Sequence, residues 1–373
     1  MGRRQKRYER RQKERAEKRE NKLAAYLNFE NVISYSALYK AAWEASKGVK
    51  WKASVQKYLL NLASNLYKTR KALLEGKDVR KGFIEFYISE RGKQRHIKSV
   101  HFQERVVQKS LCKNALYPVL TYNLITDNGA SQKGKGMHFA SKRMTNYLSR
   151  YFKKYGNDGY VLVIDFRKYF DNINHEKMKE LYSRYFKDER LLKLTNDFLD
   201  AFGDIGLGLG SETSQISAVA YINSIDHYIK ETARIRGYVR YVDDSDIIHN
   251  SKQYINELLE ELKKQYSIYG IRLNEKKTHI TKLKSGFTFL KTRFYLTDTG
   301  KVVKKPCRDS ITRERRRLKR QAKLLEKGLL NIEGIKQSYE SWKGSMKHRN
   351  ARRSVYNMQK LYDRLFNSKG VEK

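Results

Sequence analysis

An uninterrupted apolar run covers residues 159–164 and ends at Asp165. A short, continuous apolar run is typical of a strand buried on both faces of a sheet, so residues 159–164 are predicted to form a central strand. Asp165 then lies at the end of that strand. The alternative for this acid is a helix cap, since residues 166–170 are compatible with a helical turn.

A second segment places two adjacent acids, Asp243 and Asp244, between apolar half-strands at 237–241 and 246–249. Asp is depleted in strands and tolerated in turns, so we expect a β-hairpin whose bend covers residues 242–245. A sheet that held this hairpin beside the central strand would bring the acids of both segments within a few ångströms of one another. The alternative is an ordinary hairpin with a polar turn.

Helical periodicity, with apolar residues three and four positions apart, covers much of the remaining chain. One helix is predicted from about residue 34 with Ser36 as its N-cap, and another over 103–120, ended by Pro118. Further helices are predicted over 52–76, 137–154 and 216–235, and from Thr312 onward. The first 22 residues are almost wholly charged, which predicts a solvated helix that is either a frayed terminus or a phosphate-binding arm.

Short strands and glycine-rich loops separate these helices. Partial alternation over 82–89, followed by the basic segment 91–97, predicts a two-stranded hairpin, and strands are also predicted near 270–278 and 285–294. The loop at 203–215 is rich in glycine, which lets a backbone come close to a ligand. A Gly- and Lys-rich loop at 127–136 lacks the ending of a nucleotide-binding P-loop, so it favours a contact with a nucleic-acid backbone.

The net charge of the chain indicates the class of its binding partner. The 373 residues include 80 Lys and Arg against 40 Asp and Glu, a formal net charge of +40. Such an excess indicates a polyanionic partner, with nucleic acid first and an anionic membrane surface as the alternative. No apolar run approaches the roughly 18 residues of a membrane span, and no signal peptide is recognised, so we expect a cytoplasmic protein without membrane contact. Cys112 and Cys307 form neither a disulfide framework nor a zinc site.

In a protein of this charge, acids at strand ends point to divalent metal chemistry. Carboxylate oxygens hold Mg²⁺ together with substrate phosphates, and two such ions promote in-line displacement at phosphorus. The 27 tyrosines would supply flat surfaces on which bases can stack.

Two motifs, in this order, carry a resemblance to a known family. Residues 165–171 read Asp-Phe-Arg-Lys-Tyr-Phe-Asp, and residues 241–244 read Tyr-Val-Asp-Asp. They resemble the first and third palm motifs of bacterial reverse transcriptases, the group found in group II introns, retrons, defence systems and diversity-generating retroelements. The resemblance covers roughly residues 35–365 and is strongest over 91–290.

The resemblance implies an α+β fold, the right-hand polymerase, with fingers, a palm built on an antiparallel sheet, and a helical thumb. A basic helical N-terminal extension would precede these parts. The implied domains are the extension at 1–80, fingers at 81–155, palm with finger elements at 156–295, and thumb at 296–373.

The same resemblance implies RNA-directed DNA synthesis with two Mg²⁺ ions, or Mn²⁺ in their place. Asp165 and Asp243 would hold both ions, with Asp244 as an associated acid. Adjacent residues of a strand point to opposite faces, so Asp244 is expected to be the less direct ligand. Lys277 matches the lysine proposed to protonate the pyrophosphate leaving group.

Five residues match positions that contact the incoming deoxynucleotide. Arg95 would hold the triphosphate, with Lys93 assisting, and Gln215 would lie beside the nucleotide. Phe170 matches an aromatic gate that would clash with a ribose 2′-OH. Phe166 is also expected to contact the nucleotide.

Within the family, the segment Leu209-Gly210 followed by Ser214-Gln215 resembles the diversity-generating branch best, as do the loop at 133–136 and the segment 342–344. Three departures from the branch or family pattern are Gly208, Lys291 and the pair Ser245-Asp246, which stands where bulky apolar residues are usual. The resemblance therefore implies a retroelement enzyme, with phage defence as the alternative role.

The implied partners are an RNA template, a DNA or RNA primer and deoxynucleotides, with a structured non-coding RNA and an accessory protein as further candidates. No segment resembles an RNase H, zinc-finger or nuclease domain, so those steps are expected of other proteins. Two other classes stay open: a non-catalytic RNA-binding scaffold and an RNA-dependent RNA polymerase, against which Phe170 argues. A bacterial or phage origin is implied.

Overall fold

The computed structural model describes residues 21–90 and 92–367, with scattered positions among the first twenty and without the side chains of Glu90 and Lys93. The helix predicted over residues 1–22 therefore lies largely outside the described residues. The chain divides into two compact units, each assembled from three segments of sequence. The first comprises Met1–Thr126, Arg167–Tyr228 and Leu262–Arg272, and the second Asp127–Phe166, Ile229–Glu261 and Leu273–Lys373. The four domains implied by the resemblance stay a prediction.

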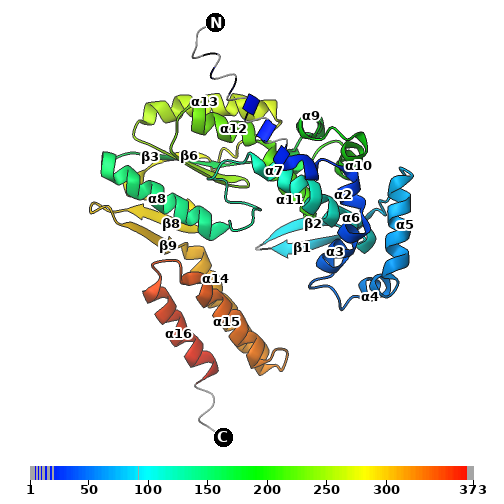
Figure 1. The fold of residues 1–373 in the computed structure, drawn as a ribbon. Coiled ribbons are helices and arrows are strands. Elements are labelled where there is room, and N and C mark those ends of the chain that lie inside the picture. The colour runs from blue at the N-terminus through cyan, green and yellow to red at the C-terminus, as the bar shows by residue number, and fades with distance from the viewer. Residues whose placement is uncertain are drawn as a thin grey trace. The chain divides into compact units, whose positions relative to one another are not determined.

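Helices dominate the first unit (Figure 1). They are η1 (Ala24–Tyr26), α2 (Phe29–Ile33), α3 (Tyr35–Ala45), α4 (Ala53–Leu60), α5 (Leu62–Leu74), α6 (Phe102–Leu111), η2 (Cys112–Leu116), α7 (Tyr117–Tyr122), η3 (Phe170–Asn172), α9 (His175–Tyr185), α10 (Glu189–Asp200), α11 (Glu212–Tyr221) and α12 (Asn223–His227). Helices α3, α5 and α6 share a core that includes Leu38, Leu66 and Val106.

The predicted hairpin of the first unit is confirmed. Strands β1 (Phe83–Glu90) and β2 (Lys93–Val100) pair antiparallel, from Phe83 opposite Val100 to Glu90 opposite Lys93. The rings of Tyr87 and His96 stack across the pair with centroids 4.8 Å apart. Cross-strand contacts of this kind stabilise the ribbon, which pairs with no third strand among the described residues.

The N-terminal helices begin and break at residues that the apolar pattern does not single out. Ser34, and not the predicted Ser36, is the N-cap of α3, because its hydroxyl accepts a hydrogen bond from the Ala37 amide. The single helix predicted over 52–76 is instead the pair α4 and α5, which meet at Asn61. The Asn61 side-chain amide donates to the Lys57 carbonyl, and such local bonds compete with continuation of a helix.

Pro118 does not end the helix predicted over 103–120. Helix α6 continues through the π-helical turn η2 into α7, which has a proline in its first turn. Pro118 lies just after the π-helical turn, where the hydrogen-bond register of the helix already changes, so the missing proline amide is accommodated and the chain stays helical there. The helix predicted over 216–235 begins earlier, where Ser211 caps α11, and it breaks at Ile222 before α12 and the π-turn η4 (Tyr228–Thr232).

The second unit is built on a four-stranded antiparallel sheet in the order β4-β5-β3-β6. Its strands are β3 (Tyr160–Asp165), β4 (Gly237–Tyr241), β5 (Asp244–His249) and β6 (His279–Lys282). The predicted central strand is confirmed, since β3 lies between β5 and β6 and its Val161, Leu162 and Ile164 are at most 1% exposed.

Helix α8 (Met137–Tyr155) confirms the helix predicted over 137–154, and it packs against this sheet (Figure 1). Its Met144 and Leu148 share a core with Val161 and Val239 of the sheet. A second, three-stranded sheet of β7 (Phe287–Phe289), β8 (Thr292–Leu296) and β9 (Val302–Pro306) joins the same core. Helix α13 (Lys252–Ile268) runs across the boundary between the two units.

Three C-terminal helices, α14 (Arg308–Glu326), α15 (Ile332–Met346) and α16 (Arg352–Phe366), form the remainder of the second unit. They have a core of their own in which the rings of Tyr339 and Tyr362 stack 4.5 Å apart. The predicted helical tail is thus confirmed, with its start at Arg308. Among the described helices, none has the length and apolar character to cross a bilayer.

Candidate active site

The sheet of the second unit sets two of the predicted acids opposite each other. Asp165 ends β3 and Asp244 begins β5, and these two residues form the last pair of the β3–β5 register. Residues directly opposite in an antiparallel pair project from the same face, with Cβ atoms about 5 Å apart. The register therefore brings two carboxylates together at one end of the sheet.

Asp243 lies in the two-residue turn, Val242-Asp243, that joins β4 to β5. Asp244 pairs with Tyr241, so it belongs to the strand, and the bend predicted over 242–245 is shorter than expected. Val242 has a φ of 57°, a left-handed conformation that is rare for a β-branched residue. The tight turn thus carries backbone strain directly beside Asp243.

Substituting Val242→Gly should relieve this strain. The left-handed conformation costs an L-residue about 1–2 kcal/mol, and glycine loses part of that gain through its own conformational entropy. We expect a net rise of about 0.5–1 kcal/mol in the free energy of unfolding, measured by urea titration. Primer extension should slow, because a looser turn positions Asp243 less well; a variant with lower stability would contradict the strain argument.

The acids repel one another, and burial adds to the effect. Burial, followed by the charges of Asp243 and Asp165, raises the pKa of Asp244 to about 7. The Lys277 ammonium balances part of this charge, since Nζ lies 2.8 Å and 3.0 Å from the two carboxylate oxygens of Asp165. That hydrogen bond is the main reason why the pKa of Lys277 is raised. The site thus concentrates negative charge that a cation can neutralise.

Two residues that the sequence reasoning missed hold Asp165 in place. The Asn274 side-chain amide donates to Asp165 Oδ1 at 3.0 Å, and its backbone amide donates to the Asp165 carbonyl at 2.8 Å. The Asp165 backbone amide donates to the Thr278 hydroxyl at 3.2 Å. Both residues flank the predicted Lys277, and that closeness in sequence is the only signal that pointed to them.

The donor set fits a hard divalent cation, because ionised carboxylate oxygens are what Mg²⁺ prefers. In the described part of the chain, however, no group of three or more His, Cys, Asp or Glu side chains is already arranged as a metal site. The Lys277 ammonium forms an ion pair with the Asp165 carboxylate. Binding of ions would thus require the carboxylates to converge and Lys277 to move off Asp165.

Directly behind these acids, Ser245 and Asp246 are each 1% exposed, where the resemblance leads one to expect apolar residues. Asp246 stands opposite Val163 of β3 and Val239 of β4. Among the described residues, no group hydrogen-bonds Asp246 Oδ2 or the Ser245 hydroxyl. Burial, then the charge of Asp244, raises the pKa of Asp246 well above its ordinary value, which favours the neutral form of this carboxyl.

Asp246→Val should therefore stabilise the protein. A buried polar group without a partner costs about 1–3 kcal/mol, and valine removes it while matching the neighbouring side chains of the sheet. We expect a gain of that size in the free energy of unfolding, measured by thermal and urea denaturation. Asp246→Asn keeps the buried polar atoms and serves as the matched control, and an equal gain in both variants would contradict this explanation.

The residues predicted to contact the nucleotide do not all belong to the same unit. Phe166 belongs to the second, and its side chain is 3% exposed, so the ring presents almost no surface to a nucleotide. Arg95 lies exposed on β2, next but one to Lys93, and Gln215 lies exposed in the first turn of α11. Phe170, also in the first unit, is half-buried, and its ring packs edge-on against Tyr169 at 6.0 Å.

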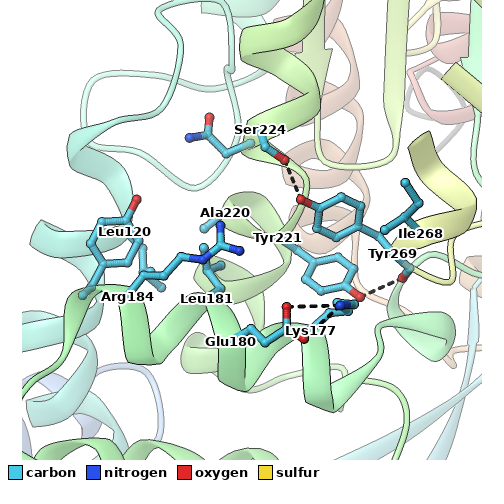
Figure 2. Close-up of a pocket in the computed structure, with 12 residues that line it drawn as sticks. Leu120, Lys177, Glu180, Leu181, Arg184, Ala220, Tyr221, Ser224, Ile268 and Tyr269 are labelled. Carbon is cyan, nitrogen blue, oxygen red and sulfur yellow. Dashed lines mark hydrogen bonds and ion pairs between the residues drawn. The ribbon is translucent and has the colours of Figure 1, made fainter. Parts of the chain in front are cut away.

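A pocket of about 360 Å³ in the first unit is lined by α9, α11 and the end of α13 (Figure 2). Lys177 is paired with Glu180 at 2.8 Å, and the Tyr221 hydroxyl donates to the Tyr269 carbonyl at 2.7 Å. None of the predicted site residues lines this pocket. Its one acid, Glu180, is paired with Lys177, so the carboxylates of the sheet remain the candidate active site.

Acids at adjoining strand ends, beside a lysine and in a strongly basic protein, are typical of enzymes that transfer nucleotidyl groups with divalent metal ions. The family comparison is more specific than this class. A family model described as reverse transcriptase (RNA-dependent DNA polymerase) matches residues 80–294. That match spans more than half of the 373 residues, and the chain belongs to this family. The predicted reverse-transcriptase family and the α+β fold of a right-hand polymerase are thereby confirmed.

Solved structures with a similar chain path include two telomerases. The apo telomerase of Candida tropicalis, truncated from its C-terminal domain, is 15% identical, with 60% of this chain and 54% of that chain covered and a TM-score of 0.47. The telomerase of Candida albicans in complex with a TWJ fragment of telomeric RNA is 11% identical, with 70% and 55% covered and a TM-score of 0.49. The chain spans about half the length of these telomerases. No curated protein matches it.

Proposed function

We propose that the chain copies an RNA template into DNA by adding deoxynucleotides to a primer, with two Mg²⁺ ions held by Asp165 and Asp243. The observation that carries the proposal is the register pairing of Asp165 with Asp244 beside the turn that presents Asp243. Bound there, the ions would supply charge neutralisation and a Lewis acid for displacement at phosphorus. Asp244, whose buried carboxyl ionises less readily, would be the less direct ligand.

The remaining residues would position the reactants. Lys277 lies beside Asp165, and once the ions displace its ammonium from that carboxylate it would be placed to protonate the departing pyrophosphate. Asn274 and Thr278 fix the backbone and one oxygen of Asp165 while this happens. Arg95 and Lys93 would bind the triphosphate and Gln215 would lie beside the nucleotide. Phosphoryl transfer depends mainly on such positioning and on charge stabilisation.

For the biological role, we propose a diversity-generating retroelement with a dedicated structured RNA. Its support is the sequence Leu209-Gly210 with Ser214-Gln215, the motif by which the chain resembles that branch. The net charge of +40 agrees with a large RNA partner or an acidic accessory protein. Phage defence is the competing role, and it predicts faithful copying where diversification predicts errors.

The test is primer extension on a defined RNA template with Mg²⁺ and the four deoxynucleotides, with the products sequenced. DNA complementary to the template would support the proposed activity, and errors concentrated opposite template adenines would support the diversity-generating role. Accurate copying would contradict that role and favour defence or another retroelement role. Tight RNA binding without extension, in Mg²⁺ and in Mn²⁺, would contradict the activity and favour an RNA-binding scaffold.

A further inference from the structure

A second cavity, of about 410 Å³, lies in the second unit, and basic and aromatic side chains line it. Its cations are Arg150 and Lys154 of α8 together with Arg234 and Arg236, which precede β4, and its rings are Tyr147, Tyr151, Tyr155 and His249. Figure 1 locates α8 and the sheet that form its walls. None of the residues assigned to the active site lines this cavity.

The cavity lies at the end of the sheet opposite to the carboxylates. His249, one of its lining residues, pairs with Tyr160 at the start of β3, whereas Asp244 pairs with Asp165 at the strand's end. Five positions of β5 separate Asp244 from His249, which corresponds to about 17 Å at 3.4 Å per residue. A ligand in this cavity would therefore lie well away from the carboxylates of the active site.

The tyrosines form a stripe along one face of α8. Tyr147, Tyr151 and Tyr155 are spaced four residues apart, which aligns side chains on a helix. The rings of Tyr151 and Tyr155 lie 5.1 Å apart, and Tyr155 is 41% exposed. Burial is the main reason that the pKa values of Tyr147 and Tyr151 rise to about 12, so both phenols stay neutral and do not repel an anion.

No carboxylate lines the cavity among the described residues. The nearby Asp127 is already held by Lys230 at 2.8 Å and by Arg143. The four lining cations are all exposed, and Arg234 adopts a left-handed backbone with a φ of 52°. This backbone conformation favours glycine. The presence of an arginine there suggests that its side chain has a function.

We propose that this cavity binds an unpaired segment of RNA, with bases stacked on Tyr151 and Tyr155 and phosphates held by the four cations. Cations alone would accept any polyanion, whereas a stripe of partly exposed aromatic rings selects a ligand with flat faces. The choice of RNA over single-stranded DNA rests on the proposed function, which brings RNA to this protein. The base-and-phosphate chemistry rests on the cavity itself.

The first experiment is photo-crosslinking of the full chain to a 12-nucleotide unstructured RNA that contains 4-thiouridine, with excess blunt RNA–DNA duplex to occupy the primer–template groove. We expect crosslinks to peptides that contain Tyr151 or Tyr155, undiminished by the duplex. Loss of these crosslinks in the duplex would overturn the proposal. Equal competition by polyglutamate would overturn the role of stacking, and tighter binding of the same sequence as DNA would overturn the assignment to RNA.

Substitutions then separate stacking from charge. Tyr155→Ala should weaken RNA binding about tenfold, since it removes the ring on which a base would stack, and Tyr155→Phe should bind as the native protein does. Arg150→Ala with Lys154→Ala should make the slope of log K against log salt shallower by about 1.4, as expected for two phosphate contacts to a single strand. Lys142→Ala with Lys153→Ala, also exposed on α8 but outside the cavity, is the matched control.

Arg234→Gly tests RNA binding by the cavity with a substitution that should not impair folding. Glycine suits the left-handed conformation, so the melting temperature should not fall, while RNA binding should weaken severalfold. Unchanged binding by this variant and by Tyr155→Ala would overturn the proposal. Extension of a short primer–template is measured in parallel, so that failure of the cavity and failure of the polymerase activity are recorded as separate results.

Discussion

Asp243→Asn is expected to reduce primer extension at least about 1,000-fold, which corresponds to about 4 kcal/mol of lost transition-state stabilisation. The substitution removes one negative charge and leaves the size of the side chain unchanged. Asp243 lies in the two-residue turn next to the paired acids Asp165 and Asp244, so its charge forms part of the local field that would hold divalent ions. The measurement is the rate of single-nucleotide addition to a DNA primer on an RNA template, in Mg²⁺ and in Mn²⁺.

The fold and the affinity for RNA should survive this substitution. Asp243 belongs to neither β4 nor β5, so the melting temperature should stay within a few degrees of the native value. Asp309→Asn, at an exposed acid in the first turn of α14, is the matched control and should retain full extension. Extension by Asp243→Asn at more than a few per cent of the native rate would contradict the assignment of this acid to the metal ions.

Phe170→Ala is expected to admit ribonucleotides, with discrimination against them falling about 100-fold, or about 2.7 kcal/mol. The half-buried ring of Phe170 is the group proposed to clash with a ribose 2′-OH, and alanine removes that obstacle. The measurement is the ratio of kcat/KM for each deoxynucleotide to that for the matching ribonucleotide. Extension with deoxynucleotides should change much less than this ratio does.

Phe170→Tyr keeps the aromatic ring and is the control for Phe170→Ala, so it should keep the native selectivity. Truncation of a ring that packs against Tyr169 also costs stability, by about 1–2 kcal/mol for a half-buried phenylalanine. The assays should therefore run well below the melting temperature of the variant. Native selectivity in Phe170→Ala would show that another residue excludes ribonucleotides.

Local sequence predicted the secondary structure well where one face of an element is continuously apolar. The strand before Asp165 and the helix α8 follow such patterns, and so does the hairpin of β4 and β5. Helix boundaries were less predictable, because they depend on single polar groups. Ser34 caps α3 and the Asn61 amide bonds to the backbone, and neither bond can be inferred from periodicity.

The candidate site was predictable in its residues and not in its geometry. The spacing of Asp165 and Asp243 within two apolar segments identified the acids, and the resemblance added Lys277. The hydrogen bonds of Asn274 and Thr278 to Asp165 join positions more than a hundred residues apart. No pattern along the chain encodes a contact of that range, so only the folded chain reveals it.

By itself, the sequence indicated the family, determined the basic charge and predicted which acids lie at the ends of strands, because these depend on residue types and short-range spacing. The tertiary structure decided which residues meet. It set Asp165 opposite Asp244, buried Asp246 behind them, and gathered Tyr151 of α8 with Arg234 around one cavity. Strand register and helix packing are fixed by how the whole core fills its volume, and that is a property of the folded chain and not of any segment of it.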